Sequence, residues 1–353
     1  MGAFGDIVKV SIFGQSHSAE IGMTMTGISA GMKVDEKELQ RFLDRRAPGK
    51  SYSTPRKEPD KVEFLSGIKD GVTDGNTVKA VIRNVDIRPK DYGDLADVPR
   101  PGHADYTAAV KYGDERGKTG GGQFSGRLTA PMCIAGGMIL QFLREEGIEI
   151  SARAYRIGKV TDEGSFPENH ICEDFPAVSE KSAKEMLSEI ENARAEGDSI
   201  GGIIECAVTG MPAGIGGPVF GGLEGKISAA VFGIPAVKGI EFGKGFACTE
   251  MKGSEANDPF YFDKAGKVKT RTNNCGGILG GISDGMPITF KVAVKPTPSI
   301  IKEQESVNLK TGEGVIMSVK GRHDPCVVPR AVPVVEAVTA IAIYDAMLGD
   351  EKD

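Results

Sequence analysis

The sequence lacks the patterns that mark the common metal and dinucleotide sites. Its six cysteines are dispersed, with no CxxC pair, and the chain has only four histidines. Because no cysteine or histidine spacing matches a zinc site, we predict reduced thiols and no metal. No GxGxxG sequence follows a predicted strand, so a Rossmann dinucleotide site is not expected.

The charge balance and the apolar runs exclude two further classes of protein. The formal net charge is −6, whereas a nucleic-acid-binding protein needs a basic surface. No stretch of the chain approaches the ~20 apolar residues that cross a bilayer, and the opening MGAFGDIVKV contains no long apolar run. We therefore predict a soluble, cytoplasmic protein with no nucleic-acid partner and no membrane partner.

The sequence does contain enough apolar residues for a core, and an excess of glycine. Hydrophobic residues make up 40% and charged residues 26% of the 353 residues, which is typical of a globular chain. The 48 glycines fall in clusters, which suit backbone that turns sharply or approaches a ligand closely. The length alone is compatible with one or two domains. Since neither a linker nor a repeat interrupts the chain, we predict a single domain over residues 1–353.

Apolar periodicity predicts both helices and strands. A capping-box pattern at Asp35 and Glu38 opens a helix that ends before Pro48. Residues 127–146 and 333–348 are apolar around nearly the whole circumference, so both helices are expected in the core, the second with Pro333 in its first turn. Residues 181–196 have one apolar stripe and are expected on the surface. The predicted strands are residues 7–12, 78–82, 148–154, 202–208 and 288–294.

The first candidate motif places a histidine between two hydroxyl residues, Ser16-His17-Ser18, just after a predicted strand. With a reference pKa of about 6.5, a histidine can donate or accept a proton near neutral pH. Taken alone, the motif favours a structural interpretation, in which the hydrogen bonds of this histidine are satisfied within the fold.

Two further motifs lie at the starts of the predicted core helices. Residues 100–106 read RPGHADY, and a glycine run at residues 120–122 leads into a helix near Arg127. Exposed amides at a helix N-terminus attract phosphate, although a flexible glycine hairpin would look the same. Arg322, His323 and Asp324 precede the last helix. They suit phosphate binding and proton transfer, or else a salt-bridged turn.

One segment comes near to a nucleotide motif. Residues 113–119, GDERGKT, are one residue short of a P-loop between the glycines, and they follow no buried strand. A P-loop nucleotidase that uses Lys118 is therefore a weak alternative.

Together these segments resemble the chorismate synthase family over essentially the whole chain, residues 14–348. RPGHADY at residues 100–106, GRHDP at 321–325 and RAVP at 330–333 are the most specific matches. The resemblance implies an α+β fold, a β-α-β sandwich with buried central helices, assembled as a homotetramer. It also implies a phosphate lyase of the shikimate pathway, which makes chorismate for aromatic amino acid biosynthesis. The reaction is a 1,4-anti elimination of phosphate from 5-enolpyruvylshikimate 3-phosphate, and it requires reduced FMN.

The resemblance also implies roles for individual residues. His17 is similar to the acid that protonates the leaving phosphate. His103 is similar to the residue that exchanges a proton with reduced flavin, and Asp324 to the carboxylate that assists proton removal through flavin N5. Substrate contacts are expected from Ser16, Arg45, Arg46, Arg127, Arg322 and Arg330. Flavin contacts are expected from Gln123, Phe124, Ser125, Ala236, Gly280, Lys295, Pro296, Thr297, Pro298, Ser299 and Arg322.

The sequence departs from the family pattern in several places, and two of these departures change the expected contacts with ligands. Gln123 and Phe124 stand where an arginine and a serine are frequent, so we expect altered flavin affinity. The loop after Pro48 is a residue shorter and lacks an arginine, so Lys50 or Arg56 is expected to supply that charge. These departures leave open a second hypothesis, a family member that binds flavin and substrate without turnover.

The source of reducing equivalents is a separate question. Some members of the family reduce their own flavin with NADPH. Because this chain has no dinucleotide fingerprint and no large insertion, the sequence favours an external flavin reductase as partner.

Overall fold

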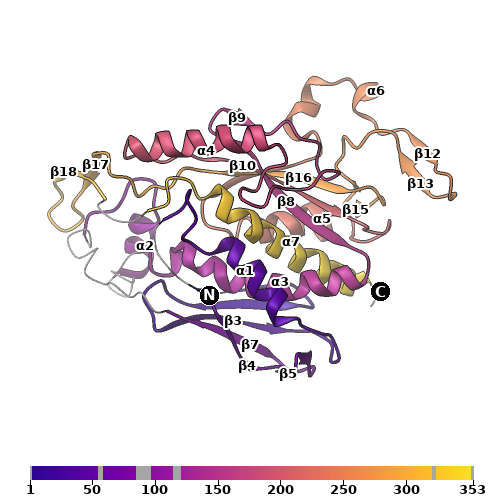
Figure 1. Cartoon of the computed structure of the whole chain (residues 1–353), viewed down its shortest axis with the longest axis horizontal. Coiled ribbons are helices and arrows are strands. Elements are labelled where there is room, and N and C mark those ends of the chain that lie inside the picture. Colours follow the sequence, from indigo (N-terminus) through magenta and orange to yellow (C-terminus); the bar gives the residue numbers. More distant parts are fainter. Residues whose placement is uncertain (1, 55–58, 85–96, 114–120, 320–322, 351–353) are drawn as a thin grey trace.

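The computed structural model describes residues 2–54, 59–84, 97–113, 121–319 and 323–350. They form two five-stranded antiparallel sheets with a layer of helices between them (Figure 1). In the first sheet the order is β1 (Ala3–Phe4), β2 (Lys9–Gly14), β3 (Glu20–Thr26), β7 (Val78–Arg83) and β4 (Val62–Ser66). In the second it is β11 (Val237–Phe242), β16 (Ile288–Val294), β10 (Gly202–Thr209), β8 (Glu149–Ile157) and β9 (Val160–Thr161).

Three helices fill the space between the sheets: α1 (Glu36–Arg46), α3 (Thr129–Glu145) and α7 (Val328–Asp350). α3 and α7 are buried over most of their length, as their apolar circumference predicts. Where they cross, a β-carbon on Gly136 would lie 2.3 Å from the carbonyl oxygen of Ala337. The glycine therefore permits the close approach of the two helices. The predicted α+β fold, a β-α-β sandwich with buried central helices, is confirmed.

Two other helices flank this layer. α4 (Glu180–Ala195) lies on the outer face of the second sheet (Figure 1), and its single apolar stripe is buried there, as predicted. α5 (Leu223–Val231) packs on α7 and β11.

The predicted strands are all present, with shifted ends. β16 coincides with residues 288–294, whereas the strand predicted at residues 7–12 begins two residues later as β2. β3, β4 and β11 were not predicted, although apolar residues alternate with other residues along β3 (Ile21, Met23 and Met25) and at the start of β4 (Val62 and Phe64). Pairing with neighbouring strands decides the conformation of those segments.

The helix ends differ from the prediction in two details. Asp35 caps α1 by accepting from the amides of Lys37 and Glu38, at 2.8 and 3.0 Å, but the reciprocal half of the capping box is missing. The Asp35 amide donates instead to Oε1 of Gln141 on α3, at 2.8 Å. α7 begins at Val328, so Pro333 lies inside the helix rather than in its first turn. Burial of an almost wholly apolar helix outweighs the backbone hydrogen bond that this proline removes.

The expectation that no stretch approaches the apolar length of a membrane span was wrong. Residues 126–145 and 328–350 both form helices that are long and apolar enough to cross a membrane, by length and composition alone. Their apolar windows are 78% and 83% buried inside the protein. The two helices are apolar because they form the central layer between the sheets.

Smaller elements complete the described chain. A hairpin and a short helix project from one end of the molecule, and another hairpin lies at the opposite end (Figure 1). The projecting elements are α6 (Gly253–Ala256), β12 (Phe260–Phe262) and β13 (Val268–Thr270); the opposite hairpin is β17 (Gln304–Val307) and β18 (Gly314–Met317). The others are β5 (Ile68–Lys69), β6 (Val72–Thr73), α2 (Asp105–Tyr112), β14 (Ile278–Leu279), β15 (Ile282–Ser283) and the 3-10 turns Gly122–Phe124, Gly126–Leu128, Val219–Gly221 and Gly245–Glu250.

Candidate active site

A cavity of about 700 Å³ opens where the starts of α3 and α7 meet the end of α1. Its volume lies within the usual range of ligand sites, roughly 300–1,000 Å³. Residues from six stretches line it, and these stretches are far apart in sequence. They lie within residues 46–54, 100–104, 121–129, 232–238, 295–299 and 323–334.

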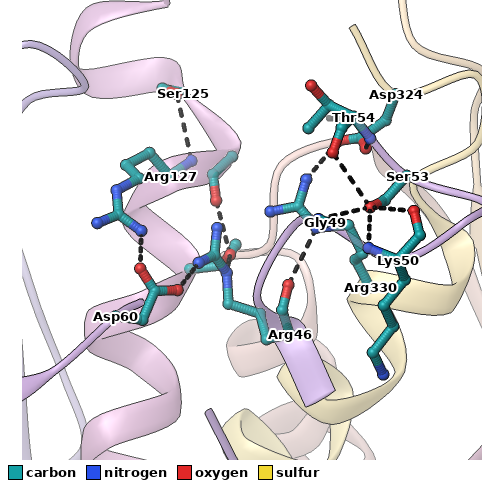
Figure 2. Close-up of polar contacts among 12 residues, drawn as sticks. Arg46, Gly49, Lys50, Ser53, Thr54, Asp60, Ser125, Arg127, Asp324 and Arg330 are labelled. Carbon is teal, nitrogen blue, oxygen red and sulfur yellow. Dashed lines mark hydrogen bonds and ion pairs between the residues drawn. The ribbon is translucent and has the colours of Figure 1, made fainter. Parts of the chain in front are cut away.

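One wall carries two buried arginines joined by a buried carboxylate (Figure 2). Asp60 accepts from Nη1 of Arg46 through Oδ2 and from Nη1 of Arg127 through Oδ1. Arg46 Nε also donates to the hydroxyl of Thr129 at 3.1 Å, and Arg127 Nε donates to Oδ1 of Asn84 at 3.1 Å. Both guanidinium groups are therefore held at two points each.

The neighbouring wall is formed by Asp324 and Arg330, at the start of α7. Asp324 accepts from the amide of Thr54 at 2.8 Å and from Nη1 of Arg330 (Figure 2). Arg330 Nε donates to the backbone carbonyl of Arg46 at 3.0 Å. These contacts join the end of α1, the loop after it and the start of α7, and they bring a third arginine to the cavity.

A third group surrounds His103. Asp105 accepts from His103 Nδ1 at 2.6 Å and from Nε and Nη2 of Arg100 at 2.7 and 2.8 Å. Burial alone would raise the pKa of Asp105, but the hydrogen bonds from Arg100 and His103 hold it well below its usual range. Because the carboxylate accepts at Nδ1, that nitrogen carries a proton, and the other ring nitrogen, Nε2, lies 3.3 Å from Nη2 of Arg100.

The remaining wall is more apolar and contains a hydroxyl without a partner. Phe124 and Phe232 line the cavity and are partly exposed, at 37% and 52%. Ala236 beside them has a φ of +74°, a left-handed conformation that alanine rarely adopts. Among the described residues, no group bonds the buried hydroxyl of Thr297. Such an orphaned polar atom in a cavity wall suits a ligand that supplies the missing bond.

Most of the predicted site residues line this cavity. They are His103 and Asp324 among the predicted catalytic residues, Arg46, Arg127 and Arg330 among the substrate residues, and Gln123, Phe124, Ser125, Ala236, Lys295, Thr297, Pro298 and Ser299 among the flavin residues. Arg322, and the Arg56 alternative to Lys50, lie outside the described residues.

Five predicted residues are not in the described cavity wall: Ser16, His17, Arg45, Gly280 and Pro296. Ser16 and His17 follow β2, and the Ser16 amide donates to the carbonyl of Gly122 at 3.2 Å, which places their loop beside the glycine-rich segment. Gly280 lies in the turn between β14 and β15.

Arg45 has a different partner from the one expected. It makes a two-pronged ion pair with Glu336 of α7, at 2.7 and 2.8 Å, and Glu336 also accepts from the Ala152 amide at 2.9 Å. Lys50 is also absent from the described cavity wall, and its Nζ lies 5.9 Å from the centre of the Tyr52 ring. Burial and the nearby Arg45 lower the pKa of Lys50.

Several residues at the site have no role that was predicted from the sequence. Arg100 and Asp105 belong to the RPGHADY motif, which carried the only sequence signal for them. Asp60 ends RKEPD, residues 56–60, one of the stretches of this sequence that are similar to the family, but that resemblance implied no role for it. Of the P-loop-like stretch, residues 114–119 lie outside the described part of the chain, and Gly113 ends α2.

Comparison with known proteins agrees with this geometry. The family "Chorismate synthase" matches residues 8–348. A chorismate synthase from Lancefieldella parvula is 47% identical and one from Methanocaldococcus jannaschii 43%; the alignments cover 98% and 99% of this chain and 95% and 96% of those proteins. A crystal structure of a chorismate synthase superimposes with a TM-score of 0.75 at 26% identity, over 98% of this chain and 93% of that one. The chain therefore belongs to the chorismate synthase family.

Proposed function

We propose that this protein is an active chorismate synthase whose reaction takes place in the cavity beside α3 and α7. The family assignment carries the proposal, because it extends over residues 8–348 and so includes every cavity-lining stretch. In the reaction the C3–O bond breaks and phosphate leaves with its electron pair. A proton leaves C6, and a second ring double bond forms, so the substrate undergoes no net oxidation or reduction.

The cationic walls of the cavity suit this substrate. 5-Enolpyruvylshikimate 3-phosphate carries one phosphate and two carboxylates. Arg46, Arg127 and Arg330 come from three different segments and all reach the cavity. Arginine forks bind carboxylate and phosphate through paired, charge-assisted hydrogen bonds. We assign the substrate's anionic groups to these arginines, with Ser16, Arg45 and Arg322 as further candidates.

The apolar wall suits reduced FMN. Phe124, Phe232 and the strained Ala236 offer a surface for a flat ring system, and the Thr297 hydroxyl offers a hydrogen bond. When bound, the reduced flavin supplies transient electron density that helps to expel phosphate. The residues assigned to hold it are Gln123 to Ser125, Ala236 and Lys295 to Ser299, with Gly280 and Arg322 as further candidates.

The chain's own proton carriers are assigned as follows. His103 Nδ1 donates a hydrogen bond to Asp105, and we assign Nε2, which lies 3.3 Å from Nη2 of Arg100, to exchange a proton at the cavity. Asp324 lines the cavity and is held by Thr54 and Arg330, and it is assigned to assist removal of the C6 proton. His17, on the loop beside Gly122, is assigned to protonate the departing phosphate. His17→Ala and His103→Ala should each reduce turnover severely, and near-normal turnover in both would overturn these roles.

The remaining expectations concern the oligomeric state of the protein, its location in the cell and its source of reduced flavin. We propose a homotetramer in the cytoplasm, supplied with reduced flavin by an external reductase. Phe220, Phe246 and Phe262 expose 97%, 80% and 75% of their surface, and large exposed aromatic residues are typical of subunit interfaces. Light scattering coupled to size-exclusion chromatography would test the tetramer.

The decisive experiment mixes the protein anaerobically with the substrate and chemically reduced FMN. Chorismate absorbance and phosphate release are followed together, and a parallel arm contains oxidised FMN and NADPH. Equal amounts of both products in the reduced arm alone would establish a synthase that needs an outside reductant. Products in both arms would add a flavin reductase activity. Flavin binding without product in either arm would favour the non-catalytic alternative and direct attention to Gln123 and Phe124.

A further inference from the structure

Asp60 occupies an unusual position for a carboxylate. Its side chain is fully buried, and its φ of +45° places the backbone in the left-handed region. A non-glycine residue in the left-handed region destabilises the folded state by roughly 1–3 kcal/mol, although aspartate and asparagine adopt this conformation more readily than most residues. Such strain persists where the surrounding structure fixes it, and it is concentrated at functional sites.

The two oxygens of Asp60 have separate partners. One accepts from Arg46, at the end of α1, and the other from Arg127, just before α3 (Figure 2). These arginines are themselves buried, with 3% and 8% exposure. Two buried guanidinium groups would repel each other, and a carboxylate between them removes that repulsion. It also fixes where each guanidinium group points.

The contacts of Arg46 show what this arrangement leaves for a ligand. Its Nε is held by Thr129 and its Nη1 by Asp60. Within the described residues, Nη2 makes no hydrogen bond, and the side chain lines the cavity. Asp60 thus immobilises one part of the guanidinium group while another donor stays available to an anion.

We propose that Asp60 is a positioning residue, which orients Arg46 and Arg127 so that they bind the anionic groups of the substrate. This inference rests on the proposed function. Asp60 does not itself line the cavity and therefore acts through the arginines. A purely structural ion pair would stabilise the fold without affecting substrate affinity.

Asp60→Asn separates orientation from charge. Asparagine keeps the shape and tolerates the left-handed backbone, but its amide nitrogen cannot accept from an arginine. The variant also removes one negative charge, so the net charge of the site rises by one, and general electrostatic attraction would make the anionic substrate bind more tightly. A positioning role predicts the opposite: weaker binding of 5-enolpyruvylshikimate 3-phosphate and a higher KM, each on the order of 10- to 100-fold. Inorganic phosphate, which makes fewer geometric demands, should bind at least as well as to the wild type.

Asp162→Asn is the matched control. Asp162 is also buried, pairs with the buried Arg153 at 2.9 Å, and lies outside the described cavity wall. Its substitution should lower the unfolding midpoint without changing the KM.

A second variant is Asp60→Gly. Glycine adopts the left-handed backbone conformation readily, and it leaves empty the space that the carboxylate occupies. Formate should restore part of the lost activity in Asp60→Gly but not in Asp60→Asn, where the amide fills that place.

The measurements are calorimetric binding of substrate and of inorganic phosphate, and the steady-state KM and kcat with reduced FMN. Unchanged or tighter substrate binding in Asp60→Asn, or no effect of formate on Asp60→Gly, would overturn the inference. A wild-type protein that binds substrate but makes no chorismate would overturn the proposed function instead. The binding measurements would still decide the role of Asp60 in that case.

Discussion

Gly136→Ala should loosen the contact between the two central helices. A β-carbon at this position of α3 would lie 2.3, 2.4 and 2.5 Å from the carbonyl oxygen, Cα and carbonyl carbon of Ala337. Ordinary contacts between carbon atoms are about 3.5–4.0 Å. All three obstacles are backbone atoms of α7, so relief requires one helix to move away from the other by roughly 1 Å.

Gly137→Ala provides the matched comparison, because it lies next to Gly136 in the same buried helix. Its β-carbon would lie 2.7 Å from Cδ1 of Leu39 and 2.9 Å from Cδ1 of Phe42. These atoms belong to side chains, which can rotate, and not to the backbone. Each substitution gains about 1 kcal/mol of helix propensity, and that gain cancels between the two variants. Overpacking against backbone should therefore leave Gly136→Ala less stable than Gly137→Ala by about 1–3 kcal/mol.

Urea unfolding followed by far-ultraviolet circular dichroism would measure the difference. The chain contains no tryptophan, so tryptophan fluorescence cannot report on it. A Gly136→Ala midpoint equal to or above that of Gly137→Ala would refute the reasoning. Because Arg127 precedes α3 and Arg330 lies in α7, the displaced helices should also raise the KM for the substrate.

Three further predictions concern other parts of the chain. Asp105→Asn should reduce the loss of folding free energy that acid causes. The pKa of Asp105 is lowered in the folded state, so the ionised carboxylate stabilises the fold fully above its ordinary pKa of 3.8, and this stabilisation is lost as the pH falls below that value. In a thiol titration of the native protein at pH 8, the exposed Cys248 should react. Cys133 and Cys326 should react only after the protein is unfolded, because burial raises the pKa of each thiol to about 12. Asp345→Ala should lower the free energy of unfolding by about 2–4 kcal/mol and speed hydrogen exchange of the amides of residues 6–8. Asp345 Oδ1 accepts from those three amides at 2.7–2.9 Å. Amide protection in the variant equal to that in the wild type would contradict this prediction.

The fold class, the family and most of the residues that line the cavity could be predicted before the structure was known. Helices that are apolar on every side, such as α3 and α7, belong in the core of a protein, and the resemblance to the family implied the β-α-β sandwich that encloses them. His103, Arg127 and Asp324 lie in motifs whose residue types are specific enough to be identified without coordinates. These motifs are short and local, which is why their spacing along the chain was sufficient.

Only the tertiary structure decided which charged groups are paired. Asp60 and Arg127 are 67 positions apart, and Arg45 and Glu336 are 291 apart, so no local pattern links either pair. Arg45 and Arg46 are neighbours on α1, yet the helix turns them toward different partners, and only Arg46 reaches the cavity. Successive residues on a helix point about 100° apart, and the packing of α7 against α1 determines which of the two directions faces Glu336 and which faces the cavity.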